Sequence, residues 1–313
     1  MFCSTCDARN HMNYPITLLT LAVVAACTAC QPKPEQTTAS QSASEAVVPA
    51  EKPRLMGENQ RLELNLPDCD GNNCPEMLLE RLSSNHPVVD AWVDQEIIKQ
   101  TQQILSIVPK DTLVADTASL ETTPASQANL QPSAAQALTA QIQPFVQSFL
   151  LLDQELRQLN ANHQIHISIK PRILNDQAPL ATVVLNSSSY LGGAHGSSAQ
   201  QYGNFDLTTG KQVRLDDLLL PQQKAQLEKA AYAVFQQWVI DSKLADNVSE
   251  YEQAWKFYLS DNFYLSQQGL ILQYAEYEIG PYVVGLPKLV ISYEDLEGIL
   301  KPQYLPQAKQ VKN

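Results

Sequence analysis

The sequence has 313 residues, with 33 acidic and 21 basic side chains, which gives a formal net charge of −12. Nucleic-acid binding needs dense lysine and arginine to neutralise phosphates, so this charge excludes a nucleic-acid partner. The same charge argues against electrostatic adsorption to anionic lipid. An acidic exterior attracts cationic partners instead.

The N-terminus has the features of a bacterial lipoprotein signal peptide. An apolar run, Ile16–Ala26, is too short to span a bilayer comfortably as a permanent helix. It leads into the lipobox-like sequence VAAC, which ends at Cys27. We therefore expect residues 1–27 to form the signal peptide and Cys27 to be lipidated. The lipid would anchor the protein to a membrane of the cell envelope, facing the periplasm. Residue 28 is not aspartate, which favours the outer membrane in a Gram-negative cell.

Residues 28–57 are expected to form a disordered tether. Up to about Arg54 they are mostly Pro, Gln, Ser, Thr, Ala and Glu, with few large apolar side chains. Such a segment buries too little surface to offset the entropy of ordering. A tether here would let the folded part stand away from the membrane.

An N-terminal α+β lobe is predicted at residues 58–178. The isoleucines of Ile165–Ile169 alternate with polar residues, which is the period of a half-buried strand. Apolar residues of Leu138–Leu159 recur at alternating spacings of four and three. That spacing could indicate a coiled coil, but it lasts about three heptads and Pro144 interrupts it. A helix packed on a sheet is the better interpretation.

Cys69 and Cys74 flank the turn-rich tetrapeptide DGNN. In an oxidising envelope compartment this spacing predicts a structural disulfide. A metal site would need further soft ligands nearby, and a redox site usually has the Cys-x-x-Cys spacing beside a helix start. We therefore predict a Cys69–Cys74 disulfide and expect no metal ion.

A glycine-rich turn follows a predicted strand that contains Val183, Val184 and Leu185. Gly192 and Gly193 permit positive φ angles, so the chain is expected to reverse there and display His195 beside Tyr190. The sequence TTGK, with its glycine at 210, then predicts a second turn that closes a hairpin.

Three motifs of this region, in the same order, resemble the C-terminal domain of the RsiV family, the lysozyme-binding ectodomain of an anti-sigma factor. They are YLGGAH at 190–195, FDLTTGK at 205–211 with LDDL at 215–218, and YEIGPYVVG at 277–285 leading into VISY at 290–293. Together they span roughly residues 180–300. The resemblance is therefore to one domain, which we place at residues 179–302, with a tail at 303–313.

The resemblance implies both a fold and a function. The fold would be α+β, with two lobes of antiparallel sheets and packed helices, as in the RsiV ectodomain. The function would be non-catalytic binding of lysozyme or of another envelope or cell-wall partner. Carried onto this sequence, the partner-binding residues are Tyr190, Gly192, Gly193, His195 and Tyr282. RsiV-type proteins have a transmembrane helix and a cytoplasmic segment where this chain has a lipobox, so signalling to a sigma factor is not expected.

The alternative function is an envelope hydrolase that acts on cell-wall material through the His195 loop. Serines lie on both sides of His195, and Asp206 or Asp216 could orient the imidazole as a base. No Gly-x-Ser-x-Gly elbow is present, and His195 has no His or Cys within motif distance. We therefore prefer a non-catalytic function without a cofactor and leave the hydrolase open.

Overall fold

The computed structural model describes residues 53–69, 71, 73–105, 132–159 and 164–306. The predicted signal peptide, the lipidation site at Cys27 and the tether up to residue 52 lie outside these ranges. Within the described ranges, no helix combines the length and the apolar character that crossing a membrane requires.

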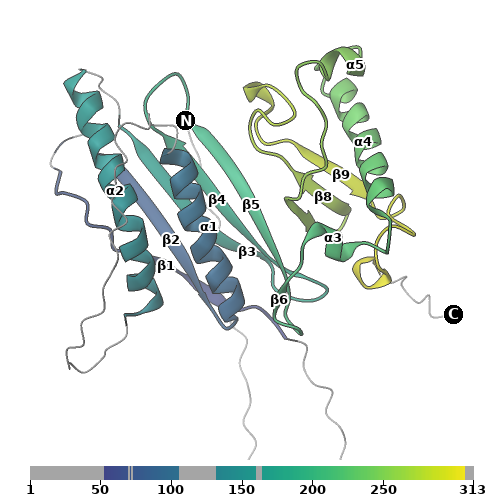
Figure 1. Ribbon diagram of the computed structural model, residues 1–313, viewed down its shortest axis with the longest axis horizontal. Coiled ribbons are helices and arrows are strands. Elements are labelled where there is room, and N and C mark those ends of the chain that lie inside the picture. Colours follow the sequence, from purple (N-terminus) through teal and green to yellow (C-terminus); the bar gives the residue numbers. More distant parts are fainter. Residues whose placement is uncertain (1–52, 70, 72, 106–131, 160–163, 307–313) are drawn as a thin grey trace, which may run out of the picture. The chain divides into compact units, whose positions relative to one another are not determined.

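The larger sheet has six strands whose order across the sheet is their order in the chain (Figure 1). They are β1 (Gly57–Arg61), β2 (Glu76–Ser84), β3 (His166–Asn175), β4 (Ala181–Tyr190), β5 (Ser197–Asp206) and β6 (Lys211–Gln212). Every neighbouring pair is antiparallel except β2 and β3, which are parallel. Parallel strands need a long crossover connection, and the two long helices of this lobe lie in it.

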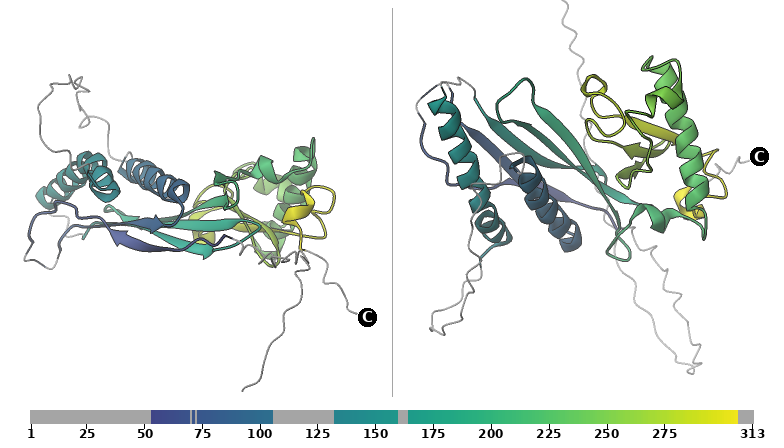
Figure 2. Two further views of the ribbon diagram at one scale, coloured as in Figure 1. Left: turned by 90° about the horizontal axis from the view of Figure 1, so that it is seen from below. Right: turned by 45° about the horizontal axis from the view of Figure 1, so that its top comes forward.

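These helices, α1 (Pro87–Leu105) and α2 (Ala134–Gln158), lie on the same face of the six-stranded sheet (Figure 2). Ser133 caps α2 through a reciprocal capping box with Gln136. The buried side chains of α2 recur at spacings of four, four, three and four: Leu138, Ile142, Val146, Phe149 and Asp153. The four apolar side chains belong to the core that α1 and the sheet also form. The helix is therefore packed against a sheet, as the preferred interpretation of the sequence has it.

An ion pair ties α1 to β2. Arg81 donates to both carboxylate oxygens of Asp94, at 3.0 and 2.9 Å, and its side chain is almost fully buried. Burial raises the pKa of the Asp94 carboxyl, and the hydrogen bond and positive charge of Arg81 act in the opposite direction. The planar guanidinium and the carboxylate fit each other at two points, so the pair fixes the helix on the strand.

A second lobe has its own sheet and core. Its elements are α3 (Leu215–Leu218), α4 (Lys224–Asp241), α5 (Val248–Tyr251), β7 (Phe263–Leu265), β8 (Gly269–Gln273), the 3-10 turn η2 (Tyr282–Val284), β9 (Lys288–Ser292) and the 3-10 turn η3 (Pro302–Tyr304). The three strands are antiparallel in the order β7-β8-β9, and α4 packs on β9. Two antiparallel-rich sheets with packed helices confirm the predicted α+β class.

The boundary between the lobes differs from the prediction. A division at residues 178 and 179 would fall between β3 and β4, which pair along almost their whole length. The larger sheet continues to Gln212, and Val213 belongs to the second core. The six-stranded sheet therefore runs across the predicted boundary, because the motifs that resemble RsiV begin on a strand of this sheet.

Two smaller boundaries are also corrected. Leu55, placed in the tether by its composition, is 1% exposed, and its N–H donates to the carbonyl of Asp176. Tyr304, placed in the tail, is buried in η3. Order therefore begins before residue 57 and continues past residue 303, because single apolar side chains at both ends reach the cores.

Two asparagine amides join β5 to the second lobe. Asn262 donates from Nδ2 to the carbonyl of Gln200 at 2.7 Å and accepts from the N–H of Tyr202 at 2.9 Å. Asn204 donates from Nδ2 to the carbonyl of Phe263 at 2.8 Å. The rings of Tyr202 and Tyr264 stack beside them, with centroids 4.4 Å apart. The Asn262 side chain therefore satisfies backbone groups of β5 that a further strand would otherwise pair with. The Asn204 side chain does the same for the carbonyl of Phe263 in β7.

Candidate functional site

The turn between β4 and β5 has the predicted backbone. Gly192 and Gly193 have φ angles of 88° and 107°, in the region that favours glycine. Tyr190, at the end of β4, donates from its hydroxyl to the carbonyl of Gly193 at 3.0 Å. This hydrogen bond stabilises the turn. His195, two residues after Gly193, is exposed.

His195 lies against Tyr282 of the second lobe. The two rings stack with centroids 3.9 Å apart and an interplanar angle of 23°. The hydroxyl of Tyr282 donates to the carbonyl of Gly196 at 3.1 Å, which fixes the stack in place. The structure therefore brings together two residues that are more than eighty positions apart in the chain.

Both ring nitrogens of His195 have polar neighbours. Nδ1 lies 2.9 Å from the carbonyl of Gly196 and Nε2 lies 3.1 Å from the hydroxyl of Tyr277. A carbonyl can only accept, so Nδ1 carries the proton in the neutral ring and Nε2 accepts from Tyr277. The imidazole is held in one orientation by two contacts.

Tyr277 extends this arrangement into a cluster of four rings. Its ring stacks against Tyr282, with centroids 5.8 Å apart, and against Trp255, with centroids 6.4 Å apart. We call Trp255, Tyr277, Tyr282 and His195 the aromatic cluster. Tyr277 is 49% exposed and Tyr282 is 37% exposed, so the cluster presents large aromatic faces to solvent. Val283, next to it, is 86% exposed.

The loop that carries Tyr277 and Tyr282 is clamped to β5 by Glu276. One carboxylate oxygen accepts from the hydroxyl of Ser197 and the other from the N–H of Ser198, both at 3.0 Å. These two hydrogen bonds satisfy polar groups at the start of β5, where β6 does not pair with it. They also hold the second lobe's loop beside the His195 turn.

A close packing contact supports the same loop from inside the second lobe. At Gly280 a Cβ would lie 2.8 Å from the Tyr251 hydroxyl oxygen, so a larger residue would displace the ring. Tyr251 is buried and donates to the carbonyl of Ile279 at 2.9 Å. Burial raises the pKa of Tyr251 to about 12. The loop that carries Tyr277 and Tyr282 is therefore closely packed against Tyr251 in the core of the second lobe.

Sequence reasoning found part of this cluster. It selected His195 and Tyr282, whose rings stack on each other, and Tyr190, which lies at the end of β4 and stabilises the turn by a hydrogen bond. It missed Tyr277, Trp255 and Glu276. Tyr277 is the first residue of the third RsiV-like motif, which was an available signal, whereas nothing in the sequence indicates that Glu276 reaches β5.

The groups considered for a hydrolase are engaged elsewhere. Asp206 accepts from the backbone N–H of Thr208 in its own turn. Asp216 pairs with Lys224, and Ser197 donates to Glu276. Among the described residues, no three His, Cys, Asp or Glu side chains gather as a metal site would require.

Two sizeable cavities lie away from His195. One of about 580 Å³ is lined by residues that include Pro179, Asp206 and Tyr304. The other, of about 320 Å³, is lined by residues that include Lys224 and Asp261. His195 lines neither of them and instead belongs to an exposed surface.

Residues 216–294 match a family model. Its description is "Protein of unknown function (DUF3298)", and the match covers most of the second lobe, including Tyr277 and Tyr282. Among curated proteins, none matches the chain significantly.

Two solved structures are similar to this chain. A DUF3298 family protein from Pseudomonas aeruginosa PAO1 is 22% identical, with 82% of this chain and 98% of that chain covered and a TM-score of 0.55. A member of the same family from Bacteroides fragilis NCTC 9343 is 17% identical, with 80% and 93% covered and a TM-score of 0.48. The first likeness shows a shared fold. Neither description mentions lysozyme or an anti-sigma factor, so the finer resemblance to RsiV stays a prediction.

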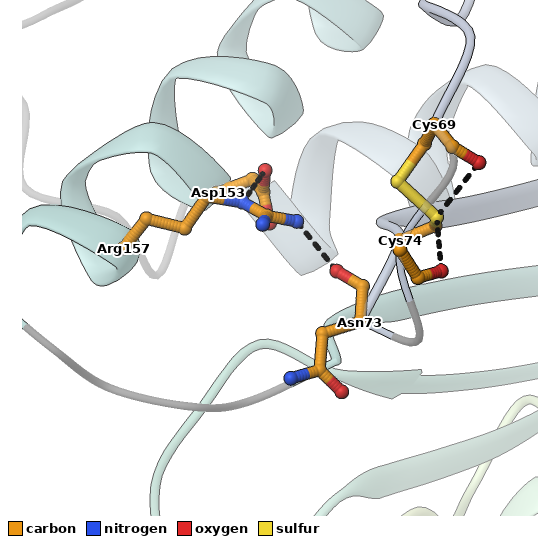
Figure 3. Close-up of a disulfide and its surroundings, with 6 residues drawn as sticks. Cys69, Asn73, Cys74, Asp153 and Arg157 are labelled. Carbon is orange, nitrogen blue, oxygen red and sulfur yellow. Dashed lines mark hydrogen bonds and ion pairs between the residues drawn. A yellow bond between two sulfur atoms is a disulfide. The ribbon is translucent and has the colours of Figure 1, made fainter.

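The disulfide lies at one end of the first lobe. Cys69 and Cys74 are bonded, as their spacing predicted, with Cα atoms 5.8 Å apart (Figure 3). Arg157 near the C-terminal end of α2 pairs with Asp153 and donates to the carbonyl of Asn73 inside the bonded loop. The loop is therefore fixed both to itself and to α2, which fits a structural role.

Proposed function

We propose that this protein is a non-catalytic binding module of the cell envelope, anchored through lipid on Cys27, that captures a cationic protein through the aromatic cluster. The observation that carries the proposal is the stack of Tyr282 on His195 with Val283 protruding beside it. Exposed aromatic rings are seldom arranged in this way without a partner, because exposing them to water is unfavourable.

The shape of the cluster suits a protein partner. Tyrosine offers a large apolar face, a polar tip and little side-chain entropy to lose, which are the properties of interface anchors. The rings here are held by hydrogen bonds to Gly196 and His195, so their ordering precedes binding. A protruding valine and an open ring face would insert into a concavity of the partner.

The charge suits a cationic partner. The chain carries a formal charge of −12, and two carboxylates, Glu276 and Glu278, flank Tyr277. Cations are also attracted to the faces of aromatic rings. Lysozymes are commonly cationic, and the resemblance to RsiV makes a lysozyme-like muramidase the first partner to test. Another cationic envelope protein could bind the same carboxylates and aromatic faces.

Titration calorimetry of the full-length protein against lysozyme tests the proposal. We expect measurable binding that Tyr282→Ala and Tyr277→Ala each weaken by about tenfold or more, the effect of losing an interface anchor. The absence of binding heat at high micromolar lysozyme would contradict the proposal that the partner is a lysozyme.

A matched pair of valines tests the location. Val283→Lys places a positive charge beside the aromatic cluster and should abolish binding of a cationic partner. Val88→Lys makes the same change at an exposed valine on α1 and should have no effect. Equal binding by both variants would show that the partner uses another surface.

A further inference from the structure

The face of the larger sheet opposite α1 and α2 carries an ordered array of polar side chains. Ile167 and Ile169 of β3 are fully buried on the side of the helices. Side chains alternate along a strand, so His166, Ser168 and Lys170 point to the other side. Figure 2 shows both helices on one face, and among the described residues no helix covers the other.

The strand register arranges this face in rows. Cross-strand partners lie on the same face of a sheet, so each row crosses β3, β4 and β5. The two central rows are Ser168, Ser188 and Ser198, and Lys170, Asn186 and Gln200. A row of hydroxyls therefore lies directly beside a row of amides and an ammonium group. All six side chains are at least partly exposed.

The amide row is fixed by hydrogen bonds. Gln200 donates from Nε2 to Oδ1 of Asn186 at 2.9 Å and accepts at Oε1 from the Tyr202 hydroxyl at 3.1 Å. The second amide hydrogen-bonding group of Asn186, its Nδ2, is a donor that this network leaves for a ligand. Asparagine is depleted in strands, so strand propensity does not explain the presence of Asn186 in the central strand β4.

An aromatic pair closes the array at one end. His166 and Tyr190 are cross-strand partners, and their rings stack with centroids 6.4 Å apart and an interplanar angle of 29°. The opposite end is the row of Arg172, Val184 and Tyr202. From Tyr190 to Val184 the strand advances by six residues, which is about 20 Å. The array is thus long and narrow, with the stacked pair of His166 and Tyr190 at one end.

The charge of this face differs from that of the whole chain. The register places Arg61, Lys170 and Arg172 on it, against the carboxylates of Glu76 and Glu80. Lys170 lies 3.9 Å from Glu80, and Arg172 is exposed. Basic side chains therefore slightly outnumber acidic ones on this face, although the whole chain has a formal net charge of −12. This balance fits a ligand with a few negative charges rather than a polyanion.

We propose that this face binds an extended, carboxylate-bearing glycan strand. Hydroxyl and amide side chains suit the hydroxyl and N-acetyl groups of sugars. Carboxylates on the glycan would meet Lys170 and Arg172. A protein ligand fits poorly on β3, β4 and β5, because Val184, the aliphatic side chain that they contribute to these rows, is only 1% exposed and offers no anchor.

The probe is a tetrasaccharide of alternating N-acetylglucosamine and N-acetylmuramic acid, titrated into the full-length protein by calorimetry. We expect binding, and binding weaker by about tenfold or more for the carboxylate-free tetrasaccharide of N-acetylglucosamine. Ser188→Leu, which blocks the hydroxyl row, and Asn186→Ala, which removes its amide, should each reduce affinity by about tenfold or more. Ser249→Leu, the same change at an exposed serine of α5, should have no effect.

Several outcomes would overturn the inference. They are no heat with either tetrasaccharide at millimolar concentration, equal affinity for the two, and unchanged affinity in both sheet variants. If Ser188→Leu fails to fold by circular dichroism, Asn186→Ala and Lys170→Gln carry the test. Tyr282→Ala should leave glycan binding intact, so this result is separable from that of the proposed protein partner.

Discussion

Tyr277 donates a hydrogen bond to Nε2 of His195 at 3.1 Å while its own backbone holds φ at 65°. A positive φ is unfavourable for any residue with a Cβ, and bulky residues rarely adopt it. Strain of this kind persists where the surrounding structure enforces it and often marks a functional site. Here the clamp of Glu276 on β5 and the packing of Gly280 enforce it, and the strained residue belongs to the exposed cluster.

The first prediction separates strain from side-chain contacts at Tyr277. Tyr277→Gly and Tyr277→Ala both remove the ring, but only glycine accepts the positive φ without strain. The glycine variant should therefore be more stable than the alanine variant by about 1 kcal/mol. Urea denaturation of both variants measures this difference. Equal midpoints would mean that the loop relaxes and that Tyr277 is not strained.

The second prediction concerns the buried ion pair of α1 and β2. Asp94→Asn leaves the guanidinium of Arg81 buried without its counter-charge and should lower the free energy of unfolding by about 3 kcal/mol. Asp216→Asn removes the partner of Lys224 in an exposed pair and should cost less than about 1 kcal/mol. Denaturant melts of both variants give the comparison. A similar small loss in each would show that Arg81 finds another acceptor.

The third prediction is a loss of stability in alkali. Burial raises the pKa of Tyr202 to about 12, and the neighbouring Tyr264 adds to the shift. The folded state keeps the Tyr202 proton where the unfolded chain loses it, at its ordinary value of 10.0. This contribution is therefore complete below pH 10 and is lost as the pH rises toward 12. The melting temperature of Tyr202→Phe should fall less steeply than that of the wild type across this window, and parallel curves would contradict the argument.

The fourth prediction concerns Cys27, which lies outside the described residues. If the lipobox is processed, mass spectrometry of the mature protein should find an acylated cysteine at its N-terminus. Cys27→Ser should release the protein from the membrane fraction. An unprocessed N-terminus in the wild type would remove the basis for the anchor.

Local patterns predicted the elements well, because each pattern has a physical cause that acts over a few residues. The alternation of Ile165–Ile169 predicted β3, and the apolar stripe that begins at Leu138 predicted α2. The spacing of Cys69 and Cys74 predicted their disulfide, and the paired glycines predicted the turn before His195. All four depend on contacts of near neighbours or on the period of one element.

The parts that could not be predicted depend on distant contacts. The predicted domain boundary falls inside the larger sheet, because β3 and β4 look alike in sequence whichever sheet they join. Glu276 has no local feature that distinguishes it from other exposed carboxylates, and its role appears only when its loop meets β5. Tyr251 and Trp255 lie four positions apart in the chain, yet the structure buries Tyr251 and brings Trp255 to the aromatic cluster.

The parallel pairing of β2 with β3 has a consequence for how the chain folds. Glu76 pairs with His166, about 90 positions later, so this pairing closes a long loop and is expected to form late in folding. One edge of β2 stays unpaired until β3 has been synthesised and has docked on it. A chaperone that shields this strand until then would therefore act on the step at which aggregation competes most strongly with folding.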